Sequence, residues 1–208
     1  MLKDKLNTIN IILASGSPRR QQFFKEMDLH YTIRLKEIEE IYPEHLQAEE
    51  ITNFLAELKA SAFENELKEN DVLVTSDTIV WLNGKALGKP KDYNDAFQML
   101  QQLANQTHEV ITSVCLKSID KTEVFHCVTK VTFANLSDEA IKYYLDNYQP
   151  FDKAGSYGIQ DWIGLIGISK IEGSYTNVVG LPTEMLFQKL MNYEIGRASC
   201  RERVSSPV

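Results

Sequence analysis

The chain has 208 residues, 43% of them hydrophobic, and its 29 acidic and 22 basic side chains give a formal net charge of -7. This length and apolar content are enough to bury one good-sized core, or two small lobes flanking a cleft. The acidic balance argues against a nucleic-acid-binding protein, which needs a basic face to replace phosphate counterions, so local basic clusters must serve a small ligand.

Targeting signals and cysteine spacing narrow the class further. No apolar run is long enough to cross a membrane and the N-terminus lacks the features of a signal peptide, so we expect a cytoplasmic protein without a membrane partner. The cysteines, Cys115, Cys127 and Cys200, and four scattered histidines give no disulfide or metal-ligand spacing. Residues 196–208 break in composition from the preceding helix; we interpret them as a vector-encoded tail and residues 1–195 as one domain.

Near the N-terminus, residues 11–20 predict a strand, a tight turn and the start of a helix, and they read Ile-Ile-Leu-Ala-Ser-Gly-Ser-Pro-Arg-Arg. Ser17 is a good N-cap and Pro18 suits the first helical position. Arg19 and Arg20 then lie in a first turn whose partial positive charge disfavours cations. A phosphate bound by amides, hydroxyls and guanidiniums would remove this conflict. A capped surface helix with two solvated arginines explains the pattern equally well.

Residues 31–35 predict a short strand, and an acidic stretch with Glu37, Glu39 and Glu40 follows. Carboxylates grouped in this way repel one another. A solvated acidic loop explains at least one of the three. The alternative is that Glu40 or its neighbour helps to hold a divalent cation through hard oxygen ligands.

Residues 48–65 predict the clearest amphipathic helix of the chain, with Lys59 at the edge of its apolar stripe. A lysine in that place more often snorkels to solvent than binds a ligand. Its position matters only if the edge of the stripe borders an anion site.

Residues 72–82 predict a buried strand with Asp77 in its middle. An unpaired buried carboxylate costs several kcal/mol, so we expect Asp77 to be protonated, paired or bound to a cation. A structural aspartate bonded to backbone amides is the alternative. Asn83 and Gly84 then predict a type I′ hairpin, after which Lys89 lies near the Asp77 end, unless it is a solvated loop lysine.

The rest of the chain carries regular patterns with little chemistry. We expect a helix over residues 93–105, an antiparallel strand pair over 108–117 and 122–133, and a helix capped by Ser137. Residues 150–160 predict a glycine-containing loop that brings backbone close to a ligand. A strand over residues 163–171 and a final helix over residues 183–193 complete the prediction.

Four separated motifs agree with one family. They are Leu-Ala-Ser-Gly-Ser-Pro-Arg-Arg (13–20), Ser-Asp-Thr-Ile-Val (76–80), Gly-Lys-Pro (88–90) and Asp-Lys-Ala-Gly-Ser-Tyr-Gly-Ile-Gln (152–160). With these, the chain resembles the Maf family of nucleoside triphosphate pyrophosphatases, from residue 11 to about residue 193. The resemblance implies an α/β fold like that of inosine triphosphatases: a long curved mixed sheet with flanking helices and two lobes around a central cleft. It also implies a homodimer, by analogy alone.

The resemblance also implies roles for individual residues. Asp77 would accept a proton from the attacking water, with Lys59 and Lys89 beside it as catalytic residues. Four residues would bind the triphosphate: Ser15, Arg20, Lys59 and Lys89. Glu40 and Asp77 would lie near a divalent cation, Mg²⁺ or Mn²⁺.

Three further positions bear on the base of the nucleotide. Arg19, Thr78 and Gln160 match the residues that mark the subgroup acting on dTTP and UTP, whereas relatives resembling 7-methyl-GTP pyrophosphatases carry Trp, Gln and Glu. A glycine often follows the glutamine in the family, and here Asp161 and Trp162 follow it. This departure is expected to affect the base pocket.

The resulting hypothesis is hydrolysis of dTTP and UTP between the α and β phosphates, with release of pyrophosphate. One rival is a related enzyme that removes modified nucleotides. The other is a non-catalytic, nucleotide-binding regulator of cell division, although a pure binder has no need of a buried base such as Asp77.

Overall fold

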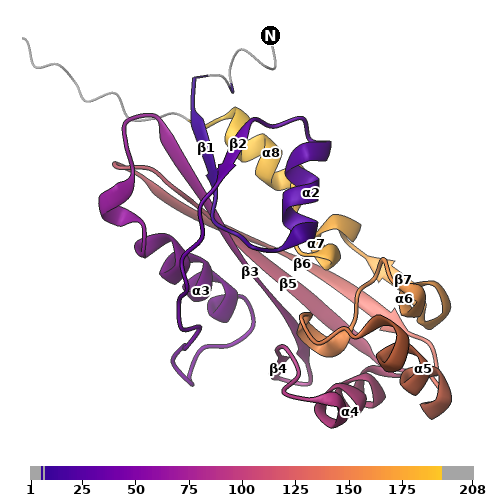
Figure 1. Cartoon of the computed structure of the whole chain (residues 1–208). Coiled ribbons are helices and arrows are strands. Elements are labelled where there is room, and N and C mark those ends of the chain that lie inside the picture. The colour runs from indigo at the N-terminus through magenta and orange to yellow at the C-terminus, as the bar shows by residue number, and fades with distance from the viewer. Residues whose placement is uncertain (1–5, 7, 194–208) are drawn as a thin grey trace, which may run out of the picture.

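The computed structural model of the chain describes residue 6 and residues 8–193, which form a seven-stranded sheet with helices on both faces (Figure 1). The strands are β1 (Asn10–Leu13), β2 (Tyr31–Ile33), β3 (Asp71–Leu82), β4 (Lys85–Leu87), β5 (Thr107–Lys117), β6 (Thr122–Phe133) and β7 (Ile168–Glu172). The helices are α2 (Pro18–Glu26), α3 (Glu49–Ser61), α4 (Tyr93–Leu103), α5 (Asp138–Tyr148), α6 (Trp162–Gly167), α7 (Tyr175–Val179) and α8 (Thr183–Met191), with the 3₁₀ turns η1 (Glu64–Glu66) and η2 (Ala154–Ser156).

The sheet is mixed, and the predicted α/β class is confirmed. Its strand order is β2-β1-β3-β5-β6-β7, with β4 paired to the end of β3. β1 runs parallel to β2 and β3, whereas the pairs from β3 through β5 and β6 to β7 are antiparallel. The three longest strands, β3, β5 and β6, run side by side through the middle of the molecule (Figure 1).

β3 contributes to two separate parts of the core. Its early residues Val72 and Val74 pack with side chains from β1, α2 and α8. Its late residues Val80 and Leu82 pack with side chains from α4, α5 and α6. Because the polar residues 75–78 lie between the two clusters, burial of apolar surface builds one lobe at each end of β3 and leaves a polar junction between them.

Several elements lie where the sequence places them. Leu82 pairs with Lys85 across the predicted hairpin, and Asn83 and Gly84 have the positive φ angles, 50° and 78°, that a type I′ turn requires. Ser137 caps α5 by accepting a hydrogen bond from the Ala140 N–H. The antiparallel pair β5–β6 is also confirmed.

The strand expected over residues 163–171 is wrong in its first half, where the structure has α6. Ile163 is buried and Leu165 is 82% exposed, although in a strand these two side chains would share a face. Gly164 permits the helix, because a Cβ there would lie 1.8 Å from the Ile159 carbonyl oxygen. An unbroken apolar run fits a buried strand or a short helix, so its pattern could not separate the two.

The helix α7 was not predicted. Ser174 begins it by accepting a hydrogen bond from the Asn177 N–H, and Gly180, with φ of 125°, ends it. No helix in the described part of the chain combines the length and apolarity needed to cross a membrane. The tail assigned to residues 196–208 lies outside the described residues.

Candidate active site

The candidate site opens along β3, where one edge of the strand lacks a partner. β5 pairs with one edge over residues 73–81, so β1 and β4 share the other, at residues 71–74 and 80–82. Among the described residues, no strand pairs with residues 75–79 on that edge. A cavity of about 960 Å³ opens there, lined by every residue predicted for the site: Ser15, Arg19, Arg20, Glu40, Lys59, Asp77, Thr78, Lys89 and Gln160.

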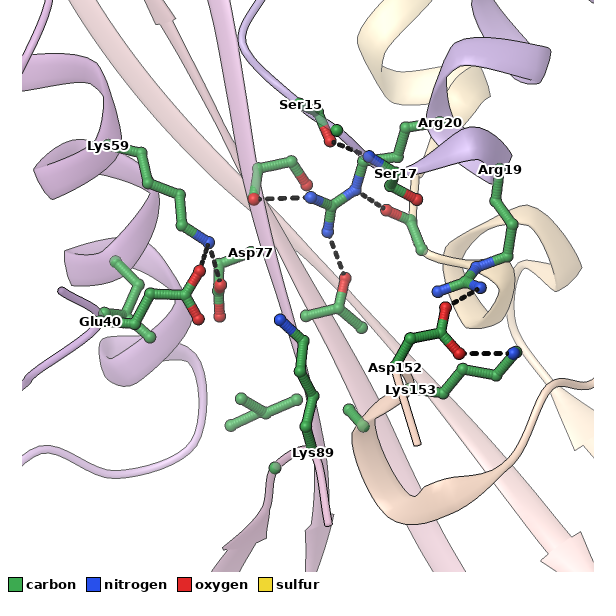
Figure 2. Close-up of a pocket in the computed structure, with 18 of the residues that line it drawn as sticks. Ser15, Ser17, Arg19, Arg20, Glu40, Lys59, Asp77, Lys89, Asp152 and Lys153 are labelled. Carbon is green, nitrogen blue, oxygen red and sulfur yellow. Dashed lines mark hydrogen bonds and ion pairs between the residues drawn. The ribbon is translucent and has the colours of Figure 1, made fainter. Parts of the chain in front are cut away.

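The cavity holds an ammonium group between two carboxylates (Figure 2). Lys59 Nζ lies 2.6 Å from Asp77 Oδ1 and 2.8 Å from Glu40 Oε1. The Thr75 hydroxyl fixes α3 against β3 by donating to the Ala56 carbonyl at 2.6 Å. Asp77 follows Thr75 by two residues and shares its face of the strand, toward Lys59. Of the states expected for Asp77, the structure therefore has the paired one.

Glu40 lies on the loop before α3 and stays ionised near neutral pH. Burial raises its pKa, but the hydrogen bond from Lys59 and the charge of Lys59 outweigh burial, so the pKa lies below its ordinary value. The charges of Lys89 and Arg20 act in the same direction. Lys89 lies just after β4, and its ammonium end points toward the carboxylates of Glu40 and Asp77 (Figure 2).

Arg20 connects α2 to β3 and to the residue that follows α7 through hydrogen bonds. Its guanidinium donates to the Gly180 carbonyl at 2.8 Å, to the Ser76 carbonyl on the open edge of β3 at 2.8 Å, and to the Thr78 hydroxyl at 2.9 Å. These contacts with described residues use three of the five N–H groups of an arginine, which leaves two for a ligand. Desolvation lowers the pKa of Arg20, and the nearby Asp77 carboxylate opposes that shift.

Arg19 makes an ion pair across the opening of the cleft. Its Nη1 lies 3.2 Å from Asp152 Oδ2, and Asp152 Oδ1 lies 2.7 Å from Lys153 Nζ (Figure 2). Burial raises the pKa of Asp152, but the two cations outweigh burial and the net shift is downward. Neither Asp152 nor Lys153 was assigned a role from the sequence. Both belong to the motif over residues 152–160, and that membership could have identified them as site residues.

The turn from β1 into α2 differs in detail from its prediction. Pro18 does occupy the first helical position, but the hydroxyl of Ser17, at the N-cap, makes no capping hydrogen bond. Instead, the Ser17 N–H donates to Ser15 Oγ at 3.3 Å. Gln21 takes part by donating from its side-chain amide to the Ser15 carbonyl at 3.0 Å. The Ser15 hydroxyl therefore stabilises the turn, and both serines line the cavity.

Residues that the sequence did not single out hold Thr78 in place. Thr112 on β5 lies opposite Thr78 in the ladder with its hydroxyl 2.9 Å away, and it donates to the Asn177 carbonyl at 3.1 Å. The buried side chain of Asn177 donates to the Val110 carbonyl at 3.0 Å. The strand over residues 108–117, expected to carry no chemistry, thus supports the site. No motif marks Thr112, because its role depends on strand register.

Gln160 is exposed on the loop after η2 and lines the cavity, whereas Asp161 and Trp162 are not among the described residues that line it. The Asp161 carboxylate accepts a hydrogen bond from the Tyr144 hydroxyl at 2.8 Å. The Trp162 ring packs on Tyr143, with ring centroids 4.8 Å apart. The side chains of Asp161 and Trp162, which depart from the family pattern, therefore pack into the lobe and away from the cavity.

Together, the fold and the site define an α/β protein with two lobes on one mixed sheet and a cleft in which cations surround a carboxylate pair. The chain belongs to the Maf-like protein family, whose model matches residues 10–193, and the resemblance noted from the motifs is confirmed.

Individual relatives agree over almost the whole chain. A dTTP/UTP pyrophosphatase of Flavobacterium psychrophilum is 68% identical, over 93% of this chain and 99% of its own length. The protein of the same name from Flavobacterium johnsoniae is 65% identical, over 91% of this chain and 98% of its own. Among solved structures, the Staphylococcus aureus Ham1 protein matches with a TM-score of 0.47 and 18% identity, covering 61% of this chain and 72% of that one.

Proposed function

We propose that this protein hydrolyses nucleoside triphosphates between the α and β phosphates, giving the monophosphate and pyrophosphate, with dTTP and UTP preferred. The observation that carries the proposal is the cavity on the open edge of β3, where Asp77 lies among Lys59, Lys89 and Arg20. In-line attack of water on a phosphate chain needs a proton acceptor beside fixed positive charge. The names of relatives that are 68% and 65% identical support the same reaction.

We assign the triphosphate to the cationic walls of the cleft. The predicted anion cradle consists of the backbone amides of residues 15–17, the two serine hydroxyls and the guanidiniums of Arg19 and Arg20, of which Arg20 has two N–H groups left for a ligand. Lys59 and Lys89 approach from the other side and neutralise charge that builds on the phosphate oxygens in the transition state. Because Arg20 is already held by three hydrogen bonds, its ligand-binding edge is pre-organised.

Asp77 is the proposed proton acceptor. Lys59 holds one of its carboxylate oxygens at 2.6 Å, which fixes the side chain and leaves the other oxygen to orient and deprotonate the water. The pairing also explains how an ionised carboxylate that is only 7% exposed is tolerated at the junction of the lobes. Fixed orientation and ionisation are both required of a general base.

Glu40 and Asp77 fit a divalent cation, Mg²⁺ or Mn²⁺, that arrives with the substrate. Each of these carboxylates bonds Lys59 through one oxygen, so the second oxygen of Glu40 is left for a small cation that would bind beside the ammonium, near Asp77. The described residues contain no cluster of three or more His, Cys, Asp or Glu able to hold a metal alone. Mg²⁺ is commonly held by one or two carboxylates plus substrate phosphates. When bound there, the cation would supply charge neutralisation at the phosphate oxygens.

Base preference is assigned to Arg19, Thr78 and Gln160. Gln160 offers one donor and one acceptor group at the cavity wall, as reading a pyrimidine edge requires. The Thr78 hydroxyl is committed to Arg20 and Thr112, so it acts by shaping the wall. Family analogy extends the proposal to a cytoplasmic homodimer.

The experiment is to measure pyrophosphate release from dTTP, UTP, CTP, GTP, 7-methyl-GTP and modified nucleotides, with Mg²⁺ or Mn²⁺ and with metal removed by EDTA. We expect selective release from dTTP and UTP that needs the metal. Preference for a modified nucleotide would favour the modified-nucleotide enzyme instead. Binding without release from any nucleotide would favour the non-catalytic regulator.

A further inference from the structure

The turn that carries Gln160 is pinned to the core of its lobe by one tyrosine. Tyr144, on α5, is fully buried. Its hydroxyl accepts from the Gly158 N–H at 3.1 Å and donates to Asp161 Oδ2 at 2.8 Å. The Asp161 N–H also donates to the Gly158 carbonyl at 3.0 Å. Both ends of the turn are therefore tied to each other and to one hydroxyl group, with Gln160 between them.

Close packing at Gly158 further limits the conformations that the turn can adopt. A Cβ at this position would lie 2.5 Å from Asp161 Oδ2 and 2.9 Å from Gln160 Nε2. The carboxylate of Asp161 and the side-chain amide of Gln160 thus both lie directly against the glycine, where any side chain would displace them. The Asp161 carbonyl, in turn, accepts from the Gly164 N–H at 3.0 Å and connects the turn to α6.

The hydrogen bonds of Tyr144 have a fixed direction. Burial, and then the hydrogen bond to Asp161, raise the pKa of Tyr144 above its ordinary range, so its hydroxyl keeps the proton that it donates to the carboxylate. The same oxygen then serves as acceptor for the amide of Gly158. Leaving either partner of such a buried bond unsatisfied carries a desolvation cost, so the turn and the tyrosine hold each other in one arrangement.

We propose that Tyr144 and Asp161 are positioning residues that hold Gln160 in the orientation that distinguishes pyrimidine bases. Neither belongs to the described residues that line the cavity, whereas Gly158 and Gln160 do. The inference rests on the proposed function, since Gln160 selects a base only if nucleotides bind this cleft. A loosened turn would let the amide of Gln160 present its donor and acceptor in several orientations. Discrimination between bases would then decrease, while the rate of the chemical step would be largely retained.

The test compares wild type with Y144F, D161A, D161N and a matched control, Y143F, whose tyrosine lies half-exposed on the same helix. Calorimetry with EDTA gives the affinities for dTTP and CTP, and turnover with Mg²⁺ gives kcat and KM. Y144F and D161A should each lower the dTTP-to-CTP affinity ratio about fivefold, through KM, with kcat for dTTP within about twofold of wild type. D161N keeps an acceptor for Tyr144 and should retain selectivity, as should Y143F.

A Q160A background separates positioning from general loosening. If Tyr144 acts through Gln160, adding Y144F to Q160A changes the affinity ratio no further. An equal loss in both backgrounds, or unchanged selectivity in Y144F and D161A, overturns the inference. Wild-type protein that binds dTTP selectively without releasing pyrophosphate refutes the proposed hydrolysis alone. Wild-type protein that binds neither nucleotide refutes both.

Discussion

Arg20 shows what single residues reveal before a structure is known. Two arginines at a helix start, where cations are unfavourable, fitted a bound anion and a pair of solvated side chains equally well. The structure adds that Arg20 also bonds to the Gly180 and Ser76 carbonyls and the Thr78 hydroxyl. No local pattern could reveal these partners, which lie 56 to 160 residues away in the chain. The sequence therefore identified Arg20 as a candidate site residue, but it did not show that Arg20 also holds distant segments together.

Replacing Arg20 by lysine should destabilise the fold while keeping the positive charge. An ammonium cannot reach three acceptors arranged for a planar guanidinium, so we expect R20K to lower the free energy of unfolding by about 2 kcal/mol. R19K is the comparison: the Arg19 partner Asp152 is 59% exposed, and the cost should stay below about 0.5 kcal/mol. Urea unfolding measures both, and equal losses would contradict the bracing role of Arg20.

At the scale of elements, the helices, strands and turns that could be predicted were those with a distinctive local sequence pattern. The hairpin at Asn83 and Gly84 was predictable because the turn itself requires those residues. The buried strand around Asp77 was predictable from its apolar runs, and the cost of an unpaired buried carboxylate made pairing one of the three states expected for Asp77. α6 was not, since its apolar run has no period that separates helix from strand, and the close approach of Gly164 to the Ile159 carbonyl, five residues earlier, depends on how the preceding turn folds. Thr112 joined the site through strand register alone.

At the scale of the whole molecule, one long strand organises both stability and the site. β3 contributes to a core cluster at each end, and its residues 75–79 have no strand partner on one edge among the described residues, which is where the cleft opens. Residues from both lobes, Arg20 and Asp152 among them, reach this junction. The cleft is therefore a product of the topology, and its chemistry depends on both lobes staying packed.

That packing should weaken in mild acid. Burial lowers the pKa of His108 to about 4 from 6.5, and its Nε2 lies 2.7 Å from the Tyr157 hydroxyl in the second lobe. Between these two pH values the unfolded chain binds the proton that the folded chain refuses, so stability falls as pH decreases, by about 3 kcal/mol in total for this group.

H108Q keeps a polar group toward Tyr157 but does not titrate. The free energy of unfolding, measured in urea from pH 7.5 to pH 4, should therefore fall less steeply in H108Q than in wild type. Identical slopes for the two proteins would contradict a buried neutral histidine.

Pyrophosphate release from dTTP with Mg²⁺, compared between wild type and Asp77→Asn, tests the proposed chemistry most directly. Asparagine preserves the shape of the side chain and an acceptor for Lys59 but cannot take a proton from water. We expect kcat to fall about 10³-fold, while dTTP binding and the unfolding transition stay close to those of wild type. Near-normal turnover by a folded Asp77→Asn protein would contradict the assignment of Asp77 as the base.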